Sequence, residues 1–284
     1  MDKSFASDLR YRLVFKNELG FSIGFNMVLV PASVSTLGKA SPEGVDMTVT
    51  DESDDKLFRR CVVNNTVYDY ISRCNADDLG ILPPPADLRL WILNSMETGS
   101  AVMMHHGAVL QNDLMKSFLG NYARILEYFL PDITIGTKGQ STYKEIYSAT
   151  AHELAHASHF AQVGTEYWDK YIRYVVESYV TNEGEFYGDG SAEGSGYCEV
   201  SEMWAYYLQS KLYKHRYGGT FPAVGTNWWF YPQIFRFMDE RGLEQSDIFS
   251  VLTEDVDTRL ALKNALLLRF PDDREMIDQV FSRY

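Results

Sequence analysis

Apolar and polar residues alternate along most of the first fifty positions of the chain. The alternating apolar residues are Tyr11, Leu13 and Phe15, then Phe21, Ile23, Phe25, Met27 and Leu29, then Val45, Met47 and Val49. A period of two residues is typical of half-buried strands in an antiparallel sheet. The segment Asn17-Glu18-Leu19-Gly20 predicts a turn between the first two runs. We therefore expect a small antiparallel β-unit over residues 1–52.

The acidic residues 51–55 indicate a boundary and the start of a helix. We expect that helix over residues 57–74, with Asn64 and Asn65 as a candidate break. Three consecutive prolines at 83–85 predict an extended connector. Leu88, Leu90 and Ile92 then alternate as in a strand.

The hydrophobic period becomes helical after Gly107. Apolar residues recur every three or four positions from Leu110 to Phe129, which predicts a helix that ends before Pro131. A second helix is expected to begin at the capping box Thr142-x-x-Glu145 and to end near Gly164. Further helices are expected at about 167–180, 198–216, 232–241, 257–268 and 272–281. The fold class predicted is α+β, with the β-unit followed by a helix-rich domain over residues 53–284.

Composition and charge exclude several classes of protein. With 284 residues, of which 45% are hydrophobic, the chain is long and apolar enough to bury a core. Its net charge of −13 repels phosphate backbones, so we expect no nucleic-acid partner. Cys61, Cys74 and Cys198 match no metal-binding or redox spacing, and no disulfide is needed.

A candidate metal site lies within the helix expected from Thr142. In His152-Glu153-Leu154-Ala155-His156, the two histidines are four residues apart and project from one helical face. Glu153 lies one position further round the helix, where its carboxylate reaches a metal-bound water rather than the metal. This is the arrangement of a hydrolytic Zn²⁺ site, in which the metal acidifies the water and the glutamate accepts its proton. The small and apolar neighbours predict a buried helix, where histidines and a glutamate without a metal would be costly.

A catalytic zinc ion usually takes three protein ligands, so a third ligand is required. The continuation His-x-x-Gly-x-x-His is absent, because His159 stands in place of the glycine and Gln162 in place of the last histidine. This argues against the metzincin type. The alternative is a glutamate on a following helix, and Glu202 and Glu199 both qualify because they share a helical face. The glutamate that is not a ligand would orient a ligating histidine.

These motifs resemble those of the zincin metallopeptidases, specifically of the gluzincin type. In several gluzincins the third ligand is a helical glutamate followed by any residue, an aromatic residue and alanine, and residues 202–205 (Glu-Met-Trp-Ala) match this. The resemblance covers residues 142–212 and implies that His152, His156 and Glu202 bind zinc and that Glu153 is the general base. It implies a zincin-like catalytic domain over residues 53–284 that hydrolyses a peptide or protein substrate.

Residues 198–208 also resemble uncharacterised bacterial zinc metallopeptidases, many of which are surface lipoproteins. This resemblance implies an extracytoplasmic protein, at the cell surface or in the periplasm, anchored through a lipid upstream of Met1. A cytoplasmic location is the alternative. The rival function is a binding or adhesion module with a structural or vestigial zinc ion, which would have a closed shell of four protein ligands.

Three other features have a functional and a structural interpretation. The glycine-rich residues 182–197 form either a wall or lid over the site or a solvated connector, and Tyr187 or Tyr197 is a candidate to polarise the scissile carbonyl. Residues 228–231 (Trp-Trp-Phe-Tyr) form either a substrate subsite or part of the core. His105-His106 is interpreted as structural, because adjacent residues point apart.

Overall fold

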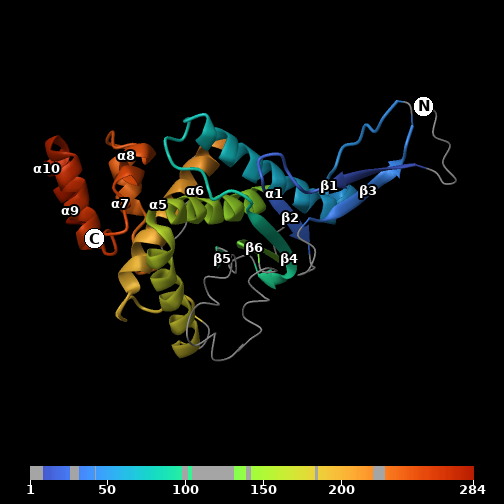
Figure 1. Ribbon diagram of the computed structural model, residues 1–284. Coiled ribbons are helices and arrows are strands. Elements are labelled where there is room, and N and C mark those ends of the chain that lie inside the picture. Colours follow the sequence, from blue (N-terminus) through green and yellow to red (C-terminus); the bar gives the residue numbers. More distant parts are fainter. Residues whose placement is uncertain are drawn as a thin grey trace.

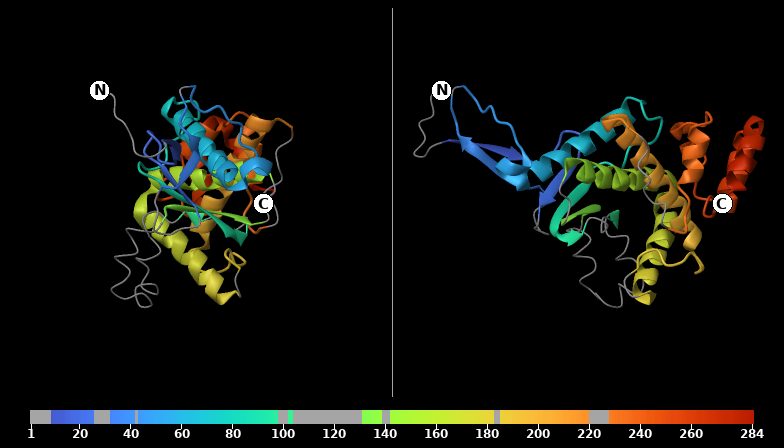
Figure 2. Two further views of the ribbon diagram at one scale, coloured as in Figure 1. Left: turned by 90° about the vertical axis from the view of Figure 1, so that its right-hand side faces the viewer. Right: turned by 180° about the vertical axis from the view of Figure 1, so that it is seen from behind.

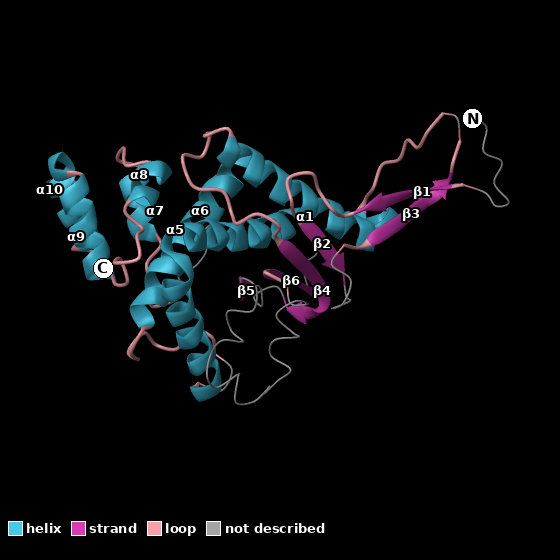
Figure 3. Cartoon of the chain, in the orientation of Figure 1, coloured by secondary structure: helices cyan, strands magenta, loops and turns pink. Residues whose placement is uncertain are grey.

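The computed structural model describes residues 9–25, 32–41, 43–97, 102–103, 131–138, 142–182, 185–219 and 228–284. Strands lie towards one end of the molecule and helices fill the rest (Figure 1, Figure 3). A small antiparallel sheet near the N-terminus is followed by a helix-rich region, which confirms the α+β class. The helix expected over 110–129 and the pair His105-His106 lie outside the described residues.

The N-terminal ribbon consists of β1 (Arg10–Val14) and β3 (Val34–Lys39), paired antiparallel. It projects from one end of the molecule, as the view from behind shows (Figure 2, right). The expected turn follows β1, where the Gly20 amide donates a hydrogen bond of 3.1 Å to the Asn17 carbonyl. The third alternating run was wrongly expected to be a strand. Val45 and Met47 lie outside any strand and are 40% and 46% exposed, because no neighbouring face covers them.

A second sheet has the order β2-β4-β6-β5. Strands β2 (Ser22–Phe25), β4 (Arg89–Glu97) and β6 (Ile133–Lys138) are parallel, and β5 (Val102–Met103) is antiparallel at the edge. Leu90, Trp91 and Ile92 of β4 are all buried, as expected for a central parallel strand covered on both faces. The second alternating run therefore pairs in parallel with β4, and residues 21–23 also keep the expected antiparallel contact with residues 15–17 through the Lys16–Ser22 bridge. The pairing with β4 crosses the boundary expected between residues 52 and 53. Met27 and Leu29 of this run lie outside the described residues.

Helix α1 (Asp51–Asn75) begins at Thr50, which forms a capping box with Ser53. The candidate break at Asn64-Asn65 is absent, because Val63 and Val67 are fully buried in the core on either side of it. Packing of an apolar helical face outweighs the weak helix propensity of two asparagines. The irregular position is instead Asp54, with φ −158° and ψ 89°.

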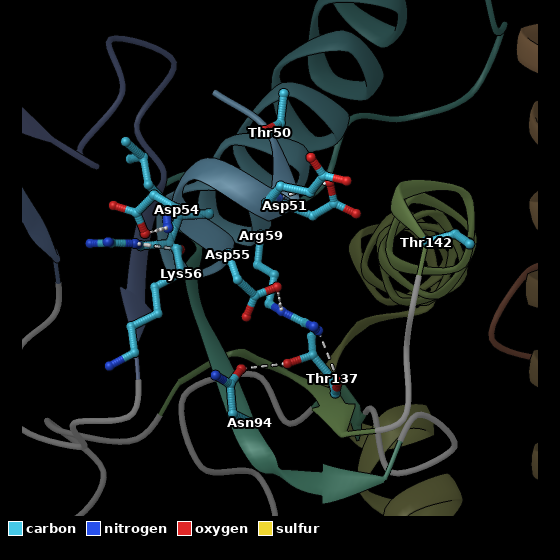
Figure 4. A network of polar contacts seen from close by, with 12 residues as sticks. Thr50, Asp51, Asp54, Asp55, Lys56, Arg59, Asn94, Thr137 and Thr142 are labelled. Carbon is cyan, nitrogen blue, oxygen red and sulfur yellow. Dashed lines mark hydrogen bonds and ion pairs between the residues drawn. The ribbon is translucent and has the colours of Figure 1, made fainter. Parts of the chain in front are cut away.

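Polar contacts tie the first turns of α1 to the second sheet (Figure 4). Arg59 pairs with Asp55 at 2.7 Å and donates a hydrogen bond of 2.9 Å to the Thr137 carbonyl of β6. The Thr137 hydroxyl in turn donates to Asn94 of β4 at 2.7 Å. These contacts hold the start of α1 beside β6 and β4.

Helix α5 (Tyr143–Thr181) begins at Thr142 with the predicted capping box. The Glu145 amide donates to the Thr142 hydroxyl at 3.3 Å, and the Thr142 amide donates to the Glu145 carboxylate at 3.0 Å. The expected end of the helix is a kink at Gly164, where φ is 77° and ψ is −176°. The two halves of α5 therefore run in different directions (Figure 1).

The remaining helices follow α5 in the order α6 (Ser195–Tyr217), α7 (Gln233–Asp239), α8 (Gln245–Ser250), α9 (Arg259–Arg269) and α10 (Arg274–Phe281), with a 3-10 turn at Pro271–Asp273. All were expected except α8, which is too short to show a helical period. The C-terminal helices form the end of the molecule opposite the ribbon (Figure 1). Among the described residues, no helix combines the length and the apolar character needed to cross a bilayer. The three cysteines are free thiols.

We expect Gly164→Ala to lower the free energy of unfolding by about 1 to 3 kcal/mol, because this backbone conformation is nearly restricted to glycine. A Cβ atom at position 164 would meet no other atom within 4 Å, so the cost would come from the backbone alone. Urea unfolding monitored by circular dichroism measures it. The control is Glu166→Ala in the same helix, where the side chain is 89% exposed. Equal stability of the two variants would contradict the prediction.

Candidate metal centre

The first half of α5 places two imidazoles side by side. His152 and His156 are one helical turn apart, and their Nε2 atoms are 3.1 Å apart. Both residues are buried, with exposed fractions of 8% and 2%. The sequence predicted this pairing from the spacing of four residues.

Glu202 of α6 completes the group. Its two carboxylate oxygens face different histidines, with Oε2 at 3.4 Å from His152 Nε2 and Oε1 at 3.4 Å from His156 Nε2. The approach of the two helices is fixed nearby, where the indole N–H of Trp204 donates a hydrogen bond of 3.1 Å to the Ala155 carbonyl of α5. The small Ala155 side chain and the buried Trp204 ring allow the helices to pack closely.

The geometry of the three donors fits a metal ion. Tetrahedral ligands at about 2.0 to 2.2 Å from a metal lie about 3.3 to 3.5 Å apart, close to the separations found here. Among the described residues, the buried Glu202 Oε2 lies 3.4 Å from His152 Nε2 but is too poorly aligned with it for a good hydrogen bond, so a cation would satisfy this oxygen. Two imidazole nitrogens and one carboxylate suit a transition metal better than Ca²⁺ or Mg²⁺, which prefer oxygen ligands. The group His152, His156 and Glu202 can therefore hold a metal ion.

Interactions with the two histidines keep the Glu202 carboxylate charged. Burial alone would raise the pKa of Glu202, but the charges and hydrogen bonds of His156 and His152 hold it well below its ordinary value. Burial would lower the pKa of His152, but the hydrogen bond and charge of Glu202, then the charge of Glu153, raise it. For His156, burial prevails and lowers the pKa. An anionic carboxylate thus faces two imidazoles, which is the charge pattern that a divalent cation needs.

Glu153 lies beside this group without belonging to it. Its Oε1 atom is 4.0 Å from His152 Nε2, and its Oε2 atom has no hydrogen-bond partner among the described residues. Burial raises the pKa of Glu153 to about 8. The Glu153 carboxyl group therefore lies beside the three donors and has a high affinity for a proton.

The structure separates the two candidate third ligands. The Glu199 carboxylate turns away from the histidines and lies 3.3 Å from Arg259 Nε of α9. Residues three apart on a helix are offset around the axis, and this offset is enough to place Glu202 and Glu199 against different neighbours. Spacing in the sequence could not show which neighbour each glutamate meets.

Two residues that hold the ligands were missed by the sequence analysis. Gln209 Oε1 lies 3.1 Å from His152 Nδ1, and Gln209 Nε2 donates a hydrogen bond of 2.7 Å to the Ser148 hydroxyl. If His152 Nδ1 carries the proton, its Nε2 lone pair is free for a metal. On the other side, the Tyr171 hydroxyl donates a hydrogen bond of 2.7 Å to Glu202 Oε1. The only signal for Gln209 was its position two helical turns after Glu202.

The other residues that the sequence analysis singled out do not belong to the group of three donors. The ring of Tyr197 packs on Tyr167 at 4.8 Å, and Lys170 lies 5.3 Å above the Tyr197 ring. The side chain of Gln162 is structural, because its Nε2 atom donates to the carbonyls of Phe249 and Leu252. His159 is fully buried, and burial lowers its pKa to about 3.

The described residues 185–194 of the glycine-rich loop between α5 and α6 pack against neighbouring side chains. At Gly190 an added Cβ atom would lie 2.5 Å from the Trp229 ring. The Tyr187 carbonyl accepts hydrogen bonds from the Tyr174 hydroxyl at 2.7 Å and from the Trp229 indole N–H at 2.9 Å. These contacts favour a wall over the alternative of a solvated connector.

Comparison of the chain with protein-family models, with curated proteins and with solved structures finds no match. The assignment of a role to this centre therefore rests on its own geometry and chemistry.

Replacement of Glu202 by alanine should weaken metal binding by more than about a hundredfold, because one of three donors is lost. Glu199→Ala should bind the metal as the wild type does, since Glu199 contacts Arg259 instead. The metal content of both variants after zinc loading and gel filtration measures this difference. Metal retained in Glu202→Ala and lost in Glu199→Ala would contradict the arrangement described above.

Gln209→Leu should weaken metal binding by about tenfold to a hundredfold, because His152 Nδ1 would lose its hydrogen-bond partner. The control is Gln209→Glu, which keeps an acceptor at this position and should bind at least as tightly. Competition with a chromophoric chelator gives the dissociation constants. An unchanged constant in Gln209→Leu would show that the hydrogen bond does not position the ligand.

Proposed function

We propose that the protein is a zinc-dependent metallopeptidase that hydrolyses peptide bonds. The observation that carries the proposal is the buried triangle of His152, His156 and Glu202 with the Glu153 carboxyl group at its side. Three donors and an adjacent base on one helix are the parts that hydrolysis by an activated water requires. The resemblance of the motifs to gluzincins supports the same proposal.

A zinc ion held by these ligands would supply a Lewis acid and a water molecule of lowered pKa. Glu153 would accept the proton of that water while the oxygen attacks the peptide carbonyl carbon. The same carboxyl group would then donate the proton to the amine as the carbon–nitrogen bond breaks, so protons balance over the reaction. Burial raises the pKa of Glu153, and the charge of a bound Zn²⁺ ion would lower it again, so the carboxyl group could both accept and donate a proton near neutral pH.

Hydrogen bonds to the ligands would keep the metal position fixed during the reaction. Gln209 forms a hydrogen bond with His152 Nδ1, and the Tyr171 hydroxyl donates a hydrogen bond to Glu202 Oε1. Groups that are already oriented need no reorganisation when charge develops in the transition state. The net charge of −13 disfavours nucleic acids as substrates, and the resemblance to gluzincins implies peptides or proteins as the substrate class.

A binding or adhesion module with a structural zinc ion is the alternative. Structural zinc sites are usually closed by four protein ligands. In the part of the chain that the structure describes, no fourth His, Cys, Asp or Glu belongs to the group. Three protein donors favour a catalytic site with a position left for water and substrate.

The test is Glu153→Gln, which should retain zinc and lose about a hundredfold to ten-thousandfold in peptide cleavage, because the amide cannot accept the proton. Mass spectrometry of a peptide mixture measures cleavage, and elemental analysis measures zinc. The control variant His156→Ala should lose both zinc and cleavage.

Full activity of Glu153→Gln would contradict the mechanism. A wild-type protein that binds iron in preference to zinc, or that takes up no metal, would contradict the proposed function itself.

A further inference from the structure

The second half of α5 borders a cavity that is separate from the candidate metal centre. The cavity has a volume of about 790 Å³ and lies between α5, the start of α6 and the segment before α9. Its lining residues are Lys170, Arg173, Tyr174, Glu177, 192–197, Asp257 and Thr258. Neither Glu153 nor any of the three candidate metal ligands belongs to this lining. A volume of this size is typical of sites that bind small molecules.

Close packing holds the walls of the cavity in place. At Gly196, an added Cβ atom would lie 2.1 Å from the Asp257 carbonyl oxygen, so the start of α6 and the segment before α9 are in direct contact. On the α5 side, the buried Tyr174 donates a hydrogen bond of 2.7 Å from its hydroxyl to the Tyr187 carbonyl. A cavity whose walls are already fixed needs little reorganisation when a ligand enters.

The two cations of the lining come from one side of α5. Lys170 and Arg173 are three residues apart, so they are neighbours on the helix surface. Lys170 pairs with Glu166 at 3.1 Å and lies 5.3 Å above the Tyr197 ring. Arg173 is exposed, and no carboxylate of the described residues lies within 4.0 Å of its guanidinium group. Arg173 is therefore the lining cation that is available to an anionic group of a ligand.

The carboxylates of the lining come from three segments. Glu177 lies one helical turn after Arg173, Glu193 precedes α6, and Asp257 precedes α9. In the part of the chain that the structure describes, none of the three carboxylates forms an ion pair within 4.0 Å. Charges of both signs therefore face the same cavity and are held apart across it.

This distribution of charge favours a ligand that carries both signs. A simple anion would pair with Arg173 but would be repelled by three carboxylates, and a simple cation would be repelled by Arg173 and Lys170. A molecule with a carboxylate at one end and an ammonium group at the other would pair with both kinds of lining group. The uncharged residues Ala192 and Gly196 leave room between them for the connecting chain.

We propose that this cavity is a binding site for a small zwitterion. The carboxylate of the ligand pairs with Arg173, and its ammonium group lies among the carboxylates of Glu177, Glu193 and Asp257. Amino acids and short peptides with free ends belong to this chemical class. The site goes beyond the proposed peptidase function and does not depend on it.

Isothermal titration calorimetry with matched probes tests the site. The probe 6-aminohexanoate carries both charges, whereas hexanoate and hexylammonium carry one charge each on a chain of the same length. At low ionic strength, 6-aminohexanoate should bind as one molecule per chain and at least about threefold more tightly than either single-charge probe. Because carboxylates also bind zinc, the titration is made with and without zinc, and the affinity should be the same.

Charge-removing variants locate the binding. Arg173→Gln should weaken the binding of 6-aminohexanoate by about threefold or more, to the level of hexylammonium, because the ligand carboxylate loses its partner. The matched control is Arg274→Gln in α10, an exposed arginine outside the lining, and it should bind as the wild type does.

Several outcomes would overturn the proposal. They are equal affinity of Arg173→Gln and the wild type, binding of hexanoate as tight as that of 6-aminohexanoate, binding that requires zinc, and no saturable binding of any probe. None of these results bears on peptide cleavage or zinc content, so this site and the peptidase function fail independently.

Discussion

The structure depends on one buried carboxylate. Glu202 is 1% exposed, and an isolated charge at such a depth would cost several kcal/mol. Its cost is offset by His152 and His156 at 3.4 Å and by the hydrogen bond from Tyr171. These partners come from both halves of α5, so the position of one side chain on α6 is linked to the path of the longest helix. A metal ion would complete the neutralisation that the imidazoles begin.

The kink at Gly164 makes this arrangement possible. A straight helix would carry residues after position 164 away from the histidines along the same axis, at 1.5 Å per residue. The change of direction brings Tyr171 to Glu202 and Tyr174 to the Tyr187 carbonyl, so one helix provides two candidate ligands and two supporting hydroxyls. Glycine is used where the backbone must leave the helical region, and its conformational freedom is confined to that point.

The sequence predicted what depends on spacing within one element. The histidine pair, the capping box at Thr142 and the change at Gly164 follow from local rules, and the structure has all three. Contacts between distant elements could not be predicted in the same way. The parallel pairing of β2 with β4, the turn of Glu199 towards Arg259 and the Gln209 contact with His152 all depend on tertiary packing. The exposed third run, with Val45 and Met47, shows that alternation predicts a strand only where a partner face exists.

Burial and ion pairing have opposite effects on the pKa values of the two glutamates in this centre. Burial raises the pKa of Glu153 to about 8, while ion pairing with the imidazoles keeps Glu202 charged, which suits a ligand. The two carboxylates differ because Glu202 lies 3.4 Å from both imidazoles and accepts a hydrogen bond from Tyr171, whereas Glu153 lies 4.0 Å from His152.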